Sequence, residues 1–159
     1  MKRLLITILA LSALSSAVYA QDNFAGIRLG YGAAFTTELS AQRYMGDITR
    51  IEVDLGLRYR DRYGDRENPS YYPIGLILGG SYQWHWFLLG GLGAYAGPAI
   101  QFSLPGWSRF GLGIGGQLGV DYQFNIPFQV FIDWRPLYLP FGPYKGFDPN
   151  GAVGIRYNF

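Results

Sequence analysis

The last nine residues of the chain, from Gly151 to Phe159, alternate strictly between two kinds of side chain. One face of the extended segment is apolar or aromatic and carries Val153, Ile155, Tyr157 and Phe159. The other face is small or polar and carries Gly154, Arg156 and Asn158. A transmembrane β-barrel requires such a strand, because lipid contacts its outer side and a polar lumen its inner side. The chain end therefore predicts a barrel strand in a membrane.

The amino terminus has the pattern of an export signal. A basic start at residues 1–3 is followed by an apolar run over residues 4–14 and by the small-x-small site Val18-Tyr19-Ala20. The apolar run is shorter than the roughly 20 residues that a spanning helix needs. We therefore expect residues 1–20 to be a cleaved signal peptide and residues 21–159 to form one domain.

Composition indicates a surface that water does not cover. Aromatic residues make up 18% of the chain and charged residues only 15%, whereas soluble domains carry roughly 25–35% charged residues on their surfaces. Lys2 and Arg3 account for the excess of basic over acidic side chains, so the mature chain is balanced and offers no electrostatic basis for binding nucleic acid. Cysteine is absent, so disulfides contribute nothing to stability.

Period-two alternation, with turn residues as boundaries, predicts an all-β, up-and-down antiparallel barrel of about eight strands. The expected spans are 24–35, 37–45, 48–60, 72–83, 86–98, 110–124, 127–138 and 151–159. Short turns alternate with longer connections, as in outer-membrane barrels with short periplasmic turns and long external loops. An even strand number places both termini on the side of the short turns.

Alternation alone does not say which face points inward. A soluble barrel of the lipocalin kind would place the apolar faces inside, around a small ligand. Three features favour a polar interior: the polar faces are rich in glycine, aromatic residues gather near both strand ends, as membrane interfaces require, and the chain ends on the aromatic Phe159. The expected girdle near the turns contains Phe24, Tyr44, Trp84, Trp86, Tyr122, Phe124, Phe128 and Tyr157.

The run Val120–Pro136 followed by Gly151–Phe159 resembles the carboxyl half of small outer-membrane β-barrel proteins common in Bacteroidota, and more broadly the eight-stranded OmpX and OmpA-domain type. The resemblance covers about the last third of the chain. It implies residence in the bacterial outer membrane, among outer-membrane lipid and lipopolysaccharide, as a monomer. It also implies assembly by the outer-membrane insertion machinery, whose signal positions are matched by Val153, Ile155, Tyr157 and Phe159. Members of this class range from adhesins and channels to lipid-modifying enzymes, so several functions stay open.

Charged residues on the predicted polar faces form the candidate site. They are Arg28, Glu52, Asp54, Arg58, Asp121, Asp133, Arg135 and Arg156. Because an unpaired charge is costly in a low-dielectric tube, we expect the acids and arginines to pair. Eight strands leave an interior just wide enough for side chains, which favours an ion-pair network that closes the lumen. A narrow porin-like channel is the alternative.

No catalytic or cofactor site is predicted. The single histidine, His85, falls in a predicted turn between Trp84 and Trp86, where an interfacial role is expected and where it lies at the wrong end for chemistry on outer-leaflet lipid. No Cys/His cluster supports zinc, and the segment 61–67 lacks a full calcium-loop pattern. The sequence therefore favours a protein that is not an enzyme and binds no cofactor or metal.

External loops are where a specific partner would bind. Aromatic and basic side chains stand there on stiff, proline-containing backbone: Trp107, Phe141, Tyr144, Lys145 and Phe147. Their composition fits contact with an external protein, a glycan or lipopolysaccharide. The alternative is that these rings only occupy the outer membrane interface.

Overall fold

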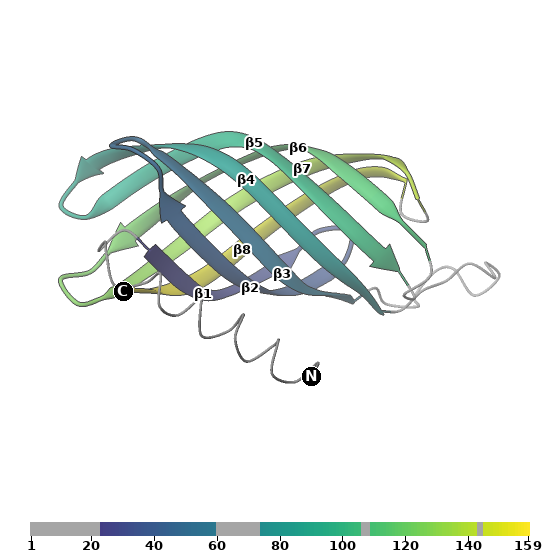
Figure 1. Ribbon diagram of the computed structural model, residues 1–159, viewed down its shortest axis with the longest axis horizontal. Coiled ribbons are helices and arrows are strands. Elements are labelled where there is room, and N and C mark those ends of the chain that lie inside the picture. The colour runs from purple at the N-terminus through teal and green to yellow at the C-terminus, as the bar shows by residue number, and fades with distance from the viewer. Residues whose placement is uncertain (1–22, 60–73, 106–108, 143–144) are drawn as a thin grey trace, which may run out of the picture.

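The computed structural model describes residues 23–59, 74–105, 109–142 and 145–159. These residues form a single barrel of eight strands (Figure 1). The strands are β1 (Asn23–Tyr31), β2 (Phe35–Tyr44), β3 (Thr49–Tyr59), β4 (Ile74–Leu89), β5 (Leu92–Pro105), β6 (Gly111–Gln123), β7 (Phe128–Phe141) and β8 (Gly146–Asn158). Each strand pairs antiparallel with the next, and β1 pairs with β8, so the sheet closes on itself. The predicted fold class is confirmed. The described residues include no helix that is long and apolar enough to cross a membrane.

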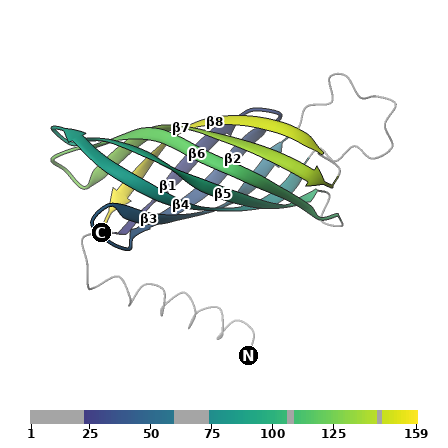
Figure 2. The same ribbon diagram turned by 90° about the horizontal axis from the view of Figure 1, so that it is seen from above.

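The two ends of the barrel differ. The turn end carries the connections 45–48, 90–91 and 124–127 together with the start of β1 and the end of β8. At the loop end the first hairpin turns at residues 32–34, β3, β5 and β7 end, and β4, β6 and β8 begin. The strands run obliquely to the long axis of the barrel (Figure 2), which is the tilt that closure of a sheet requires.

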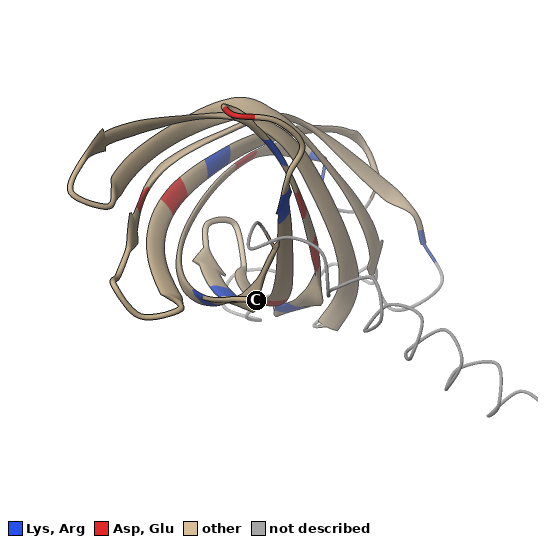
Figure 3. Ribbon diagram, turned by 60° about the vertical axis from the view of Figure 1, so that its left-hand side comes forward, with Lys and Arg blue, Asp and Glu red and all other residues tan. Residues whose placement is uncertain are grey.

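Side chains alternate across the barrel wall as the membrane interpretation predicts. Most buried side chains are polar or charged, whereas the large apolar side chains of every strand are exposed on the outer face. This is the reverse of a soluble barrel, whose apolar faces would fill the interior. A few apolar side chains do lie inside, chiefly Ile77, Ala99, Leu137 and Leu139 in the half of the barrel near the loop end. Charged residues lie well inside the strands and not only at their ends (Figure 3).

The predicted turn at residues 83–85 is wrong. β4 continues through Trp84 and His85 to Leu89, and the chain reverses at Gly90 and Gly91. Their φ angles are 56° and 90°, the two positive values that a tight mirror-image hairpin turn requires and that glycine adopts without strain. The residues before and after Gly90 and Gly91 are apolar, so the alternation of side chains does not indicate where the strand ends.

Further strand boundaries differ from the predicted ones; β5, for example, runs from Leu92 to Pro105 and not over 86–98. β2 starts at Phe35 and alternates cleanly, so that Glu38 points into the barrel. β7 extends to Phe141 and β8 begins at Gly146, so residues that were predicted to form a loop are paired, for example Leu137 with Asp148. Pro140 and Pro149 are typical of a loop, yet β7 contains Pro140, and Pro149 pairs with Pro136 in the β7–β8 ladder.

Candidate functional site: the charged lumen

All eight predicted lumen residues project into the barrel, and none is more than 4% exposed. Arg28, Arg135 and Arg156 form a central cluster with four carboxylates, those of Glu38, Glu52, Asp54 and Asp133. Arg28 on β1 binds Glu38 at 2.7 Å and Asp133 at 2.8 Å. Several of these ion pairs cross the lumen, so the cluster joins strands that are not neighbours in the sheet.

Arg135 spans the widest gap in this cluster. From β7 its guanidinium reaches Glu38 on β2 at 3.3 Å and Glu52 on β3 at 3.0 Å, and it also pairs with Asp54. Arg156, from β8, binds the second oxygen of Glu52 at 2.7 Å. β3 and β7 lie on opposite sides of an eight-stranded barrel, so these side chains bridge its interior.

Uncharged groups complete the cluster. The amide of Gln117 donates to Glu52 at 3.1 Å and to Asp133 at 3.0 Å, and its oxygen accepts from Arg135 at 3.2 Å. The Arg156 guanidinium stacks on the Phe131 ring at 3.7 Å and donates to the Ser40 hydroxyl at 3.0 Å. Such contacts offset part of the cost of removing charges from water; the Asp54 Oδ1 is the oxygen of this cluster without a hydrogen-bond partner among the described residues.

A second cluster lies toward the turn end. The Nε2 of His85 lies 3.1 Å from Asp121, and its Nδ1 lies 3.1 Å from the Tyr44 hydroxyl. Arg50 binds the other oxygen of Asp121 at 2.8 Å and covers the Tyr95 ring at 4.2 Å. His85 is only 1% exposed, so its expected place in an interfacial turn is wrong; it lies in the lumen. Phe24 and Tyr44, both predicted for the outer girdle, also face inward, with ring centres 6.1 Å apart.

A substitution of His85 tests whether its side chain lies in the lumen or at the membrane interface. His85→Leu is expected to lower the free energy of unfolding by about 1–3 kcal/mol, because it removes the buried imidazole that binds the Tyr44 hydroxyl and one Asp121 oxygen. Denaturant unfolding of the refolded barrel measures the effect. Trp86→Phe, on the lipid-facing side of the same strand, is the control and should change stability by less than about 0.5 kcal/mol. Equal small effects would contradict the lumen position.

A third contact lies near the loop end. Arg58 binds Asp148 at 2.8 Å, and the other oxygen of Asp148 accepts from the backbone amide of Ala33 at 3.0 Å. This contact joins β3 to β8 and fixes the first hairpin. Beside it, the fully buried side chains of Leu137 and Leu139 also occupy the interior.

Sequence reasoning missed several residues of these clusters. Arg50 has the same strand parity as Glu52, so alternation alone could have found it. Glu38 was missed because alternation in the predicted strand 37–45 is poor, and Asp148 because the last strand was predicted to start at residue 151. Phe131 and Tyr95 were missed because buried aromatic residues carry no polar signal.

The other predicted residues lie on the outside or beyond the described residues. Val153, Ile155, Tyr157 and Phe159 all point outward along β8 and its end. Phe141 and Phe147 are exposed at the loop end, as is Lys145. Trp107, Tyr144, the segment 61–67 and the expected signal peptide lie outside the described residues. Within the part of the chain that the structure describes, no group of three or more His, Cys, Asp or Glu side chains could hold a metal ion.

Three solved structures share this barrel. Neisserial surface protein A is 17% identical, with a TM-score of 0.60 over 87% of this chain and 95% of that one. The N-terminal β-barrel domain of OprF from Pseudomonas aeruginosa is 18% identical, with a TM-score of 0.60 over 87% of this chain and 98% of the domain. A de novo designed transmembrane β-barrel is 13% identical, with a TM-score of 0.56 over 87% and 96%.

No protein-family model matches the sequence, and no curated protein is significantly similar to it. At the identities of the three structures, the likeness concerns the fold. The resemblance noted in the last third of the sequence therefore extends, as architecture, over most of the chain: this protein has the fold of the small eight-stranded transmembrane β-barrels.

Proposed function

We propose that this chain is a monomeric bacterial outer-membrane barrel without catalytic activity, whose lumen is closed by its own side chains and which serves a structural or surface-contact role. The observation that carries the proposal is the central cluster, in which Arg28, Arg135 and Arg156 bind carboxylates of strands that are not their neighbours. An ion entering the barrel would have to separate these pairs.

The rest of the interior supports the same conclusion. Toward the turn end, Arg50, His85 and Asp121 occupy the lumen together with the ring of Tyr95. Toward the loop end, the interior contains the apolar side chains of Ile77, Leu137 and Leu139. A conducting pore needs a continuous wet path with binding sites that an ion can also leave. Paired charges in the middle and an apolar layer beside them oppose both requirements.

The surroundings of His85 support the proposal that the protein has no catalytic activity. A hydrolase of the serine class needs a histidine whose ring nitrogen faces a nucleophilic hydroxyl next to an open site. Among the described residues, the two ring nitrogens of His85 face Tyr44 and Asp121, and the imidazole is buried. No substrate reaches such a ring without disruption of the cluster.

A surface-contact role would use the loop end. Phe141, Lys145 and Phe147 are exposed there beside the outer ends of β7 and β8. Rings and a lysine at this level suit contact with lipopolysaccharide, or with an external protein or glycan.

Cell fractionation followed by gel mobility with and without heating tests the membrane assignment. We expect the protein in the outer-membrane fraction, where it should migrate faster unheated than heated. A soluble periplasmic protein would overturn the proposal.

Planar-bilayer recording tests the closed lumen. The wild-type barrel is expected to show no discrete conductance. Arg156→Ala should lower the free energy of unfolding by about 3 kcal/mol, since Glu52 loses one of its arginines, and should still not conduct because Arg28 and Arg135 remain. Stable unitary currents in the wild type, or currents that appear in Arg156→Ala without loss of stability, would instead favour the narrow channel.

A further inference from the structure

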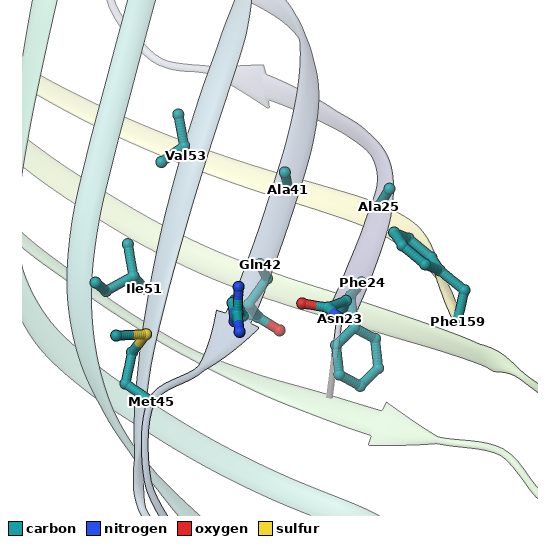
Figure 4. A pocket seen from close by; sticks show the side chains of 10 residues that line it. Asn23, Phe24, Ala25, Ala41, Gln42, Met45, Ile51, Val53 and Phe159 are labelled. Atoms are coloured by element: carbon teal, nitrogen blue, oxygen red, sulfur yellow. The ribbon is translucent and has the colours of Figure 1, made fainter. Parts of the chain in front are cut away.

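A groove of about 310 Å³ lies on the outer face of β1, β2 and β3 near the turn end (Figure 4). Ala25 and Ala41 lie between its walls. Ile51, Val53 and Met45 line one side and Phe159 lines the other. The groove exists because Ala25 pairs with Ala41 in the ladder and Ala41 pairs with Val53, so two neighbouring strands present only methyl groups between bulky side chains.

A basic side chain stands at the end of this groove nearest the turns. Arg43 is the next outward-facing residue of β2 after Ala41, lies across from Asn23 and Ile51 in the ladder, and belongs to the lining. It is exposed, and among the described residues its guanidinium makes no hydrogen bond or ion pair. Of the basic residues that the structure describes, Arg43 is the one on the outer face at the turn end.

β1, β2 and β3 present no outward-facing aromatic side chain at the turn end, although Phe159, which follows β8, forms one wall of the groove. Around that end the outward-facing aromatic residues come from β4, β6, β7 and β8 and their adjoining turns: Trp84, Trp86, Tyr122, Phe124, Phe128, Tyr157 and Phe159. β1, β2 and β3 present Ala25, Ala41, Arg43 and Ile51 there instead. Aromatic rings usually anchor a barrel at the headgroup layer. On β1, β2 and β3, which lack such rings, the outer face instead carries the groove with Arg43 at its rim.

From this arrangement we propose that the groove is a binding site for one anionic phospholipid of the leaflet at the turn end. An acyl chain lies over Ala25 and Ala41, and the lipid phosphate binds the Arg43 guanidinium, which can donate two parallel hydrogen bonds to phosphate oxygens. The charge selects the headgroup and the groove holds the chain. The inference depends on the membrane assignment proposed above but is independent of whether the lumen is closed.

Native mass spectrometry of the refolded, delipidated barrel tests the site with phosphatidylglycerol and phosphatidylcholine of identical acyl chains, offered in equal amounts. The wild type is expected to retain one phosphatidylglycerol in preference. Arg43→Gln should lower that preference about five-fold, the factor expected for one cation at an anionic lipid surface. Arg43→Lys keeps the charge and should keep most of the preference. Ala41→Leu fills the groove and should reduce retention of both lipids.

Two substitutions serve as matched controls. Lys145→Gln removes an exposed charge at the loop end, and Ala94→Leu adds the same bulk to the outer face of β5 at the turn end. Both should bind as the wild type does, and an excess of free glycerol phosphate should not displace the lipid. The inference is overturned if Arg43→Gln binds like Lys145→Gln, or Ala41→Leu like Ala94→Leu. Normal heat-modifiable mobility in those same samples would leave the proposed function intact.

Discussion

Replacing Arg135 by methionine is expected to lower the free energy of unfolding by about 3–5 kcal/mol, the largest effect of any single lumen substitution considered. Arg135 binds Glu38, Glu52 and Asp54 at once. The other two arginines still bind Glu38 and Glu52, but Asp54 has no other ion-pair partner among the described residues. Methionine fills similar volume without a charge, so the loss reflects the weakened pairing of the carboxylates, above all that of Asp54, and not a cavity.

Urea titration of the refolded barrel, followed by tryptophan fluorescence and gel mobility, measures this loss. Lys145→Met at the exposed loop end is the control and should stay within about 0.5 kcal/mol of the wild type. Adding Asp54→Asn to Arg135→Met should recover part of the stability, because the second change removes the buried charge that the first leaves unpaired. If Arg135→Met costs less than about 1 kcal/mol, the cluster does not hold the barrel together.

Alternation along single strands was enough to predict the barrel and the direction of its side chains. In β8, for example, Val153 and Ile155 face outward while Arg156 is buried. This works because the side-chain period of a strand is two, whatever its neighbours are. It failed for His85, where a run with apolar side chains on both faces hid the continuation of β4 to Gly90.

The ion-pair partners of each charged residue could not be predicted from the sequence. Arg135 contacts Glu52 over a sequence separation of 83 residues and from the opposite strand of the barrel. Which acid an arginine meets depends on strand tilt and on the stagger between strands, and neither is encoded by local alternation. The groove below Arg43 has the same origin, because Ala25 and Ala41 become neighbours only through the register of β1 with β2.

Gly26→Ala is expected to disrupt the closure of the barrel, at a cost of about 3 kcal/mol or more. Gly26 lies in β1 opposite Arg156 of β8, at the seam where the first and last strands meet. A Cβ at this position would overlap the backbone carbonyl oxygen of Ile155. That carbonyl belongs to the paired backbone of β8, so it cannot move aside as a flexible side chain would. The methyl group therefore forces β1 and β8 apart, and a barrel without a closed seam exposes unpaired backbone groups to lipid.

Gly80→Ala is the matched control for this prediction. The same methyl group at Gly80 would meet only the Glu52 carbonyl oxygen at 3.8 Å and the Ile100 Cγ2 at 3.9 Å, which are ordinary contacts. Alanine is also favoured over glycine inside a strand by about 0.5–1 kcal/mol, so Gly80→Ala should be neutral or stabilising. The fraction of heat-modifiable protein after refolding and the urea midpoint compare the two variants. Both substitutions add one carbon to a glycine of the same barrel. A lower stability of Gly26→Ala alone would therefore show that β1 and β8 pack too closely for a side chain at this position. Equal stability of the two variants would show that the seam has room for one.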